Sequence, residues 1–148
     1  MNRLAVLAAG AAALTLLTTT PALAAAAPAE TVTSCGASGL QSGLATRVCA
    51  DVSGTTVEFY GTVALAGPPS PGSPAPAPRQ LFTTLSVEAV GGGSPVTYDR
   101  PVVFTASAVE VRALAASAPC GSTLRASFGV ASFPWPSRPV VHEVTLTC

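Results

Sequence analysis

One segment near the C-terminus gathers side chains that are common in binding sites. It reads Phe133-Pro-Trp-Pro-Ser-Arg138 and contains the only tryptophan of the chain, Trp135. Trp and Arg are the residues most often found as hot spots of binding interfaces. The prolines on both sides of Trp135 restrict the backbone, which reduces the entropy lost when a partner binds. We therefore interpret Phe133, Trp135 and Arg138 as candidate binding residues for an extracellular protein or a surface ligand.

Trp135 also has a purely structural interpretation. A lone tryptophan ordinarily packs its ring against apolar neighbours. On that ground we expect the ring to fold back and cap the open end of the domain. Solvent exposure of the ring decides between the two roles.

His142 is the only histidine and could serve as a general base if a nucleophile and an orienting carboxylate lay beside it. By strand alternation it faces Phe128 on the apolar side, whereas Glu143 points to the opposite face. The sequence contains no Gly-x-Ser-x-Gly motif. We therefore expect His142 to be packed or hydrogen-bonded, and we expect no catalytic residues and no enzymatic activity.

Acidic side chains could supply a pair of carboxylates for glycoside hydrolysis. The candidates are Asp51, Glu58, Glu88, Asp99, Glu110 and Glu143. Most of them lie at strand positions that alternate with apolar residues, so we interpret them as solvent-exposed members of surface pairs, such as Arg47 diagonal to Glu58. The glycines at 91–93 lead into a proline rather than a helix, so no phosphate loop is indicated. We expect no cofactor.

Four cysteines, Cys35, Cys49, Cys120 and Cys148, indicate two disulfides with three conceivable pairings. Pairing of neighbours along the chain, Cys35 with Cys49 and Cys120 with Cys148, is favoured. A zinc site is disfavoured because no two cysteines are two to four residues apart and there is a single histidine. No metal is therefore expected.

The last pair of cysteines flanks a predicted hairpin. Residues 123–131 and 140–147 alternate as two strands, and placing Leu124 opposite Leu146 matches their apolar faces. The same register brings Cys120 opposite Cys148 to within one bulge. Alternation and cysteine placement thus predict the same disulfide-closed hairpin.

The first half of the mature chain predicts a strand at 31–35, a Gly/Ser-rich loop at 36–45 and a second hairpin. Its strands, 46–52 and 55–65, flank Ser53-Gly54, and Val52 is expected opposite Thr55. This pattern places Cys49 on the more solvent-exposed face, so its disulfide is expected to hold an edge or an end of the sheet rather than the core.

A proline-rich segment at 67–78 cannot enter a sheet, because proline lacks the N–H donor. We interpret it as an extended, solvated connection between strands rather than as a docking motif.

Residues 79–90 predict a long strand with Leu81, Leu85, Val87 and Ala89 on one face. A turn region is expected at 96–101. Residues 102–113 are strand-like, but their apolar parity switches, which indicates a bulge or a change of sheet. A small-residue connection is expected at 113–119.

These patterns predict an all-β domain over residues 31–148 with about seven strands and two disulfides. An antiparallel β-sandwich of immunoglobulin-like architecture is favoured, and a small closed β-barrel is the alternative. A true immunoglobulin domain is disfavoured because Trp135 lies in a late loop rather than on the third strand.

The N-terminus predicts export. A basic start, an apolar run at 4–17 and an Ala-x-Ala site make residues 1–24 a secretory signal peptide, with cleavage after Ala24 or, alternatively, Ala26. Residues 25–30 are expected to be a disordered leader. No later segment is long and apolar enough to span a bilayer, so the product is expected to be secreted, with no membrane attachment after cleavage.

The composition of the chain excludes one class of partner and indicates the kind of genome that encodes it. The seven basic residues are all arginine and balance seven carboxylates, so the near-neutral charge gives no case for a nucleic-acid partner. Lysine and isoleucine are absent, which is typical of a protein from a GC-rich bacterial genome.

The cysteine layout is similar to that of the bacterial subtilisin-inhibitor proteins, which are exported, β-rich and carry two disulfides. That resemblance covers only the cysteines, and it implies an inhibitory loop at Cys120-Gly-Ser-Thr-Leu124, a stretch that here contains Gly121 and runs directly into a strand. We expect a secreted, non-enzymatic binding or structural module, and the alternative is an inhibitor of an exported protease.

Overall fold

The computed structural model describes residues 30–148; the predicted signal peptide and the leader up to residue 29 lie outside this range. Within it the chain contains no helix, and therefore none that could cross a membrane. The strands are β1 (Thr31–Cys35), β2 (Gly39–Gln41), β3 (Leu44–Ser53), β4 (Thr56–Leu65), β5 (Arg79–Ala89), β6 (Gly92–Phe104), β7 (Val109–Ser117), β8 (Thr123–Ala131) and β9 (Val140–Thr145).

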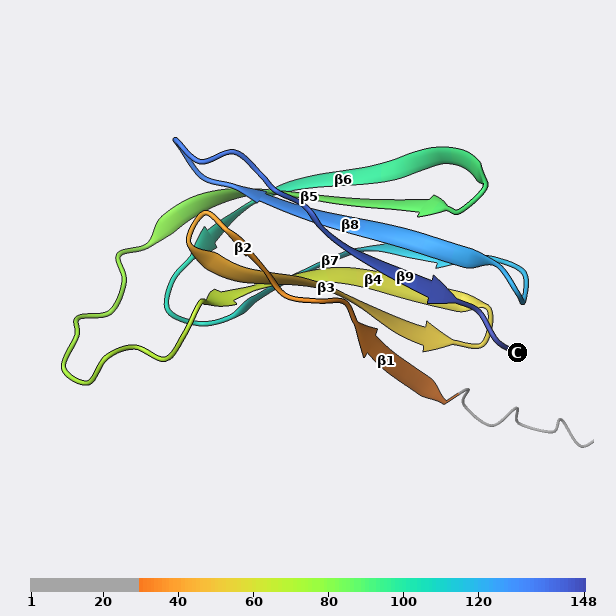
Figure 1. The fold of residues 1–148 in the computed structure, drawn as a ribbon, viewed down its shortest axis with the longest axis horizontal. Coiled ribbons are helices and arrows are strands. Elements are labelled where there is room, and N and C mark those ends of the chain that lie inside the picture. The colour runs from red at the N-terminus through yellow and green to blue at the C-terminus, as the bar shows by residue number, and fades with distance from the viewer. Residues whose placement is uncertain (1–29) are drawn as a thin grey trace, which may run out of the picture.

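The strands form two antiparallel sheets that face each other as a β-sandwich (Figure 1). The five-stranded sheet has the order β1-β3-β4-β7, with β2 also paired to β3, and the four-stranded sheet has the order β6-β5-β8-β9. The predicted sandwich is therefore confirmed, and the sheets do not close into a barrel. Consecutive strands β3 and β4 pair within the five-stranded sheet, and the chain crosses to the four-stranded sheet between β4 and β5.

The core lies between the two sheets and follows directly from the alternation of apolar residues. Along β5, for example, Leu81 and Leu85 are fully buried while Phe82 between them is exposed. Side chains of successive strand residues point to opposite faces, so one face of each sheet supplies the core. The buried apolar residues are Leu44, Val48, Ala50, Val57, Phe59, Val63, Leu81, Leu85, Val87, Phe104, Val111, Leu124, Ala126, Phe128, Val130, Val144 and Leu146.

A glycine in β4, Gly61, faces an aromatic ring of the other sheet. A Cβ at Gly61 would overlap the ring of Phe128, which comes from β8 in the facing sheet. Phe128 is fully buried. The missing side chain at Gly61 therefore leaves the space that the Phe128 ring occupies.

The register of the C-terminal hairpin differs from the predicted one by two residues. Leu124 pairs with Val144, and His142 pairs with Ala126 rather than with Phe128. A shift of two residues keeps every side chain on its face, so alternation alone cannot detect it. The inward-facing positions were predicted correctly, and only the cross-strand partners were wrong.

The first hairpin is displaced in the same way. Val52 pairs with Val57 instead of Thr55, and the two-residue turn is Gly54-Thr55. Gly54 has a φ of 59°, a conformation that glycine adopts without strain. The turn therefore begins one residue later than predicted because the left-handed position falls on the glycine.

The predicted turn at 96–101 and the predicted connection at 113–119 are wrong, because strands run through both. Residues 96–101 belong to β6, an edge strand, where Pro95 and Pro101 are tolerated because one side of the strand has no partner. Residues 113–117 belong to β7. The parity switch between 102 and 113 marks the predicted change of sheet, from β6 to β7, with residues 105–108 as the crossing.

Both disulfides have the predicted pairing. Cys35–Cys49 joins edge strand β1 to β3, and Cys120–Cys148 ties the end of the chain to the segment before β8. The prediction that Cys49 lies on a solvent-exposed face is wrong, since only 3% of this residue is exposed. Its face of the sheet is covered by neighbouring side chains, described below.

Candidate functional site

A pocket of about 470 Å³ lies at one end of the sandwich, beside the loop that contains Trp135. The loop between β8 and β9 and the turn between β2 and β3 both lie at this end, as does the proline-rich connection (Figure 1). We call this cavity the Trp135 pocket; it is lined by Leu40, Gln41, Ser42, Gly43, Arg79, Trp135, Pro136 and Arg138.

One wall of the pocket is the β2–β3 turn. Gln41 pairs with Leu44, so Ser42 and Gly43 form a two-residue hairpin connection. Both have positive φ, 51° and 74° respectively, which is the type I′ geometry that matches the twist of a hairpin. The predicted loop at 36–45 thus contains strand β2 and an ordered turn.

The opposite wall is the β8–β9 loop, whose tip is held by its own backbone. The N–H of Trp135 donates to the carbonyl oxygen of Ser132 at 2.6 Å, and the N–H of Ser132 donates to the carbonyl oxygen of Trp135 at 3.1 Å. The Ser132 hydroxyl also donates to the carbonyl oxygen of Gln80 at 3.2 Å. These contacts fix the position from which the Trp135 side chain projects.

The buried side chain of Gln41 connects the two walls. Its Nε2 donates to the Phe128 carbonyl oxygen at 3.0 Å, and its Oε1 accepts the Val130 N–H at 2.9 Å. The same Oε1 accepts the backbone N–H of Arg138 at 3.1 Å. Strand β9 pairs with β8 only as far as Phe128, opposite Val140. The Gln41 carboxamide therefore takes the place of a strand along the unpaired end of β8.

Two arginines face the pocket from different segments. Arg79 begins β5 and donates from Nη2 to the carbonyl oxygen of Ser42 at 2.9 Å. Arg138 belongs to the β8–β9 loop and is exposed. Within residues 30–148 neither arginine is paired with a carboxylate, and no carboxylate lines the pocket. The pocket therefore carries uncompensated positive charge.

The expectation that the Trp135 ring is buried is wrong, since 62% of the residue is exposed. Leu40, on the facing wall, is 68% exposed. Trp135 and Arg138 are brought together by the pocket, whereas Phe133, 95% exposed, does not line it. Leu40 and Trp135 thus belong to the wall of the pocket, whereas Phe133 lies on the loop outside it.

His142 lies on the core-facing side of β9, as predicted, and it is partly buried. Its Nε2 is 2.9 Å from the hydroxyl oxygen of Ser34 in β1, so this hydrogen bond joins the edges of the two sheets. Burial lowers the pKa of His142, which favours the neutral imidazole. Glu143 points to the other face and pairs with Arg125 at 2.8 Å. Ser34 and His142 thus have the distance of a nucleophile and base, but no carboxylate of residues 30–148 bonds the imidazole to orient it.

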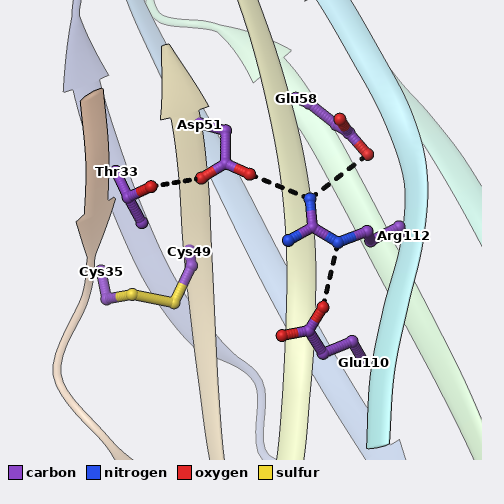
Figure 2. A network of polar contacts seen from close by, with 7 residues as sticks. All are labelled: Thr33, Cys35, Cys49, Asp51, Glu58, Glu110 and Arg112. Atoms are coloured by element: carbon purple, nitrogen blue, oxygen red, sulfur yellow. Dashed lines mark hydrogen bonds and ion pairs between the residues drawn. A yellow bond between two sulfur atoms is a disulfide. The ribbon is translucent and has the colours of Figure 1, made fainter. Parts of the chain in front are cut away.

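A polar network covers the outer face of the five-stranded sheet (Figure 2). Arg112 in β7 contacts three carboxylates: Asp51 at 2.9 Å, Glu110 at 3.0 Å and Glu58 at 3.5 Å. Its guanidinium also lies 3.8 Å from the centroid of the Tyr60 ring. The expected partner of Glu58 was Arg47, which instead donates to Ser38. The bulge between β4 and β7 aligns Arg112 rather than Ala113 with Tyr60.

The network also explains the burial of Cys49, while its disulfide partner Cys35 is exposed at the edge strand β1. Cys49 lies between Cys35 and Tyr60 in the register across β1, β3 and β4, and Tyr60 is only 6% exposed. The hydroxyl of Thr33 donates to Asp51 at 2.7 Å, and this bond together with Arg112 lowers the pKa of Asp51. We interpret the network as a structural cover for this face.

The remaining acidic candidates are also engaged on strand surfaces. Glu88 and Glu143 flank Arg125, and Asp99 accepts the Thr84 hydroxyl at 2.6 Å. Across the described part of the chain, no group of three or more His, Cys, Asp or Glu side chains is arranged to hold a metal ion.

The segment that corresponds to an inhibitory loop is a tight turn. The N–H of Gly121 donates to the carbonyl oxygen of Leu146 at 2.7 Å, and Ser122 accepts the N–H of Leu146 at 2.9 Å. Leu124, where the implied loop would end, is 4% exposed. This stretch lies flat against the end of the chain and presents no extended loop.

Sequence reasoning missed five residues that line the pocket: Leu40, Gln41, Ser42, Gly43 and Arg79. The Ser-Gly dipeptide between Gln41 and Leu44 is the same hairpin signal as Ser53-Gly54 and could have revealed the β2–β3 turn. No local pattern marks Gln41, because its partners Phe128, Val130 and Arg138 are 87 to 97 residues away.

Comparison of the chain with protein-family models, with curated proteins and with solved structures finds no match in any of the three. The chemistry of the Trp135 pocket is therefore the ground on which a function is proposed.

Proposed function

We propose that this protein is a secreted, disulfide-stabilised binding module without enzymatic activity, and that it takes its ligand in the Trp135 pocket. Two disulfides are typical of proteins from oxidising, extracellular compartments. Export is further supported by the signal-peptide pattern of residues 1–24.

The observation that carries the proposal is the state of Trp135. Its backbone is held by two hydrogen bonds to Ser132, yet 62% of the residue is exposed beside a cavity. An exposed aromatic side chain costs free energy in a monomer, because its apolar area remains in contact with water. Cavities of this size that are lined by aromatic side chains and a few polar groups are typical of small-ligand sites.

Preorganisation supports the same conclusion. Gln41 fixes the backbone of Arg138 and the turn at Ser42-Gly43, so both walls are held before a ligand arrives. A site that is already ordered loses less entropy on binding. A purely structural role would not require an open pocket with two arginines that no carboxylate of residues 30–148 pairs.

The proposal is tested by asking what the protein retains from its own growth medium. The purified mature chain is incubated with the small-molecule fraction of the medium in which it is produced, and bound species are detected by native mass spectrometry. The wild type and Phe133→Ala should retain the same species, while Trp135→Ala and Arg138→Ala should lose it. Retention by all four chains, or by none, would refute the pocket as the functional site.

A further inference from the structure

We propose that the ligand of the Trp135 pocket is an organic anion in which a carboxylate or phosphate group is attached to a flat apolar ring. This inference rests on the proposed binding function and adds the chemical class of the ligand.

The positive charge of the pocket favours an anionic ligand. Two of its eight lining residues are arginines and none is acidic. By contrast, two smaller clefts contain acidic side chains, Glu88 beside Arg125 in one and Glu30 in the other. Arg112 and Arg125 form ion pairs with carboxylates, whereas no carboxylate of residues 30–148 pairs with Arg79 or Arg138. Within the pocket itself no carboxylate offsets the charge of Arg79 and Arg138, so an external oxyanion would meet no acidic side chain among the lining residues.

The geometry of arginine narrows the anion to an oxyanion. A guanidinium presents five N–H donors in a planar fork that matches two oxygens of a carboxylate or a phosphate. Arg79 uses Nη2 for the carbonyl oxygen of Ser42, which anchors its guanidinium while other N–H groups stay available. A bidentate contact with Arg138 or Arg79 then supplies the polar end of the ligand site.

The apolar walls of the pocket favour a ligand that contains a flat ring. The Trp135 side chain, Leu40 and Pro136 line the pocket. Aromatic faces prefer offset stacking against other flat rings, with a gain beyond simple area burial. A ligand with an oxyanion at one end and a flat ring at the other satisfies both parts of the pocket at once.

The inference is tested with four probes on the mature chain: 2-naphthoate, 2-naphthyl phosphate, the neutral 2-naphthamide and acetate. Binding is followed through the indole N–H resonance of Trp135, which is unique because the chain has one tryptophan. We expect 2-naphthoate, 2-naphthyl phosphate or both to bind about tenfold or more tightly than the amide, the effect of one charge-assisted hydrogen bond. Acetate, which lacks the ring, should bind far more weakly.

Matched variants assign the preference to named residues. Arg138→Gln should reduce the preference for the anion over the amide, and Trp135→Ala should reduce the affinity for all three naphthyl probes. Arg100→Gln, a change of an exposed arginine outside the pocket, should leave both unchanged.

The outcomes separate the ligand class from the binding function. Equal binding of 2-naphthoate and 2-naphthamide at Trp135 would overturn the anion inference and leave a binding pocket. A failure of every probe to move the Trp135 resonance would also overturn the ligand class. The proposed binding function is tested separately, by whether the protein retains a species from its growth medium. The relative affinities of 2-naphthoate and 2-naphthyl phosphate show which of the two oxyanions the arginines prefer.

Discussion

The side-chain oxygen of Gln41 accepts the backbone N–H of Val130 at 2.9 Å, so a residue of the β2–β3 hairpin completes the hydrogen bonding of a strand in the other sheet. The same oxygen reaches the N–H of Arg138 at 3.1 Å. One buried carboxamide thus links the two sheets and both walls of the pocket.

Replacing Gln41 with Leu should destabilise the fold by about 3 kcal/mol. The change leaves the Val130 N–H and the Phe128 carbonyl oxygen without their partner in a buried region, and each unsatisfied group costs roughly 1–3 kcal/mol. Urea unfolding measures the difference. The control is Gln80→Leu at an exposed strand position, which should change stability by less than about 0.5 kcal/mol. Equal effects of the two changes would mean that the Gln41 contacts contribute nothing specific.

Gly61→Ala should destabilise the protein by roughly 1–3 kcal/mol, because the added methyl group overlaps the Phe128 ring. Thermal unfolding measures the loss. Phe128→Leu should reduce the free energy of unfolding by less in the Gly61→Ala variant than in the wild type, because the smaller side chain relieves the overlap. Gly67→Ala, where a Cβ would meet nothing within 4 Å, serves as the neutral control. A neutral Gly61→Ala would contradict the close packing of the sheets.

Stability should fall as the pH is lowered through the ordinary pKa of histidine. Burial lowers the pKa of His142 in the folded state, so the unfolded chain takes up its proton first. The contribution of neutral His142 is complete above about pH 6.5 and is lost as the pH falls toward the lowered folded pKa. Unfolding free energies between pH 8 and 5 measure this slope, which His142→Gln should flatten. An unchanged slope in the variant would contradict the assignment to His142.

Arg112→Gln should destabilise the protein at neutral pH by about 1 kcal/mol. Each exposed ion pair contributes less than that, but the change removes three of them at once. The Thr33 hydroxyl and Arg112 lower the pKa of Asp51, so its contribution is complete above the ordinary carboxyl pKa and is lost as the pH falls through the lowered value. The variant should therefore approach the wild type in stability at acidic pH. Arg47→Gln is the matched control, because within residues 30–148 the Arg47 side chain bonds to the Ser38 hydroxyl and to no carboxylate. A difference that stays constant between pH 7 and 3 would argue against an electrostatic role for Arg112.

The sequence contained enough information to predict the layers of this fold but not the details of its pairing. Alternation correctly assigned faces for residues such as Leu85 and Val144, because burial and strand period are linked. It could not distinguish Leu124 opposite Val144 from Leu124 opposite Leu146, since both registers put the same side chains inside. Register depends on turns, and the turn at Gly54-Thr55 was placed one residue early.

The pocket was harder to foresee because its parts are distant in sequence. Trp135 and Arg138 were recognised from their residue types, but the usual burial of tryptophan predicted the wrong environment for the ring. Two backbone hydrogen bonds with Ser132 close the turn that contains Trp135, and the side chain of Trp135 lines the pocket instead of entering the core. Arg79 begins a strand and joins the site only through the packing of the two sheets.

Collisional quenching of Trp135 fluorescence tests the account most directly, because this single tryptophan reports on the pocket alone. Iodide and caesium ions of equal concentration probe both the exposure of the ring and the sign of the local charge. We predict efficient quenching by iodide and weaker quenching by caesium, because Arg79 and Arg138 concentrate anions near the ring, and Arg138→Gln should narrow that difference. A ring that neither ion quenches, or that caesium quenches at least as well as iodide, would contradict an open, positively charged pocket.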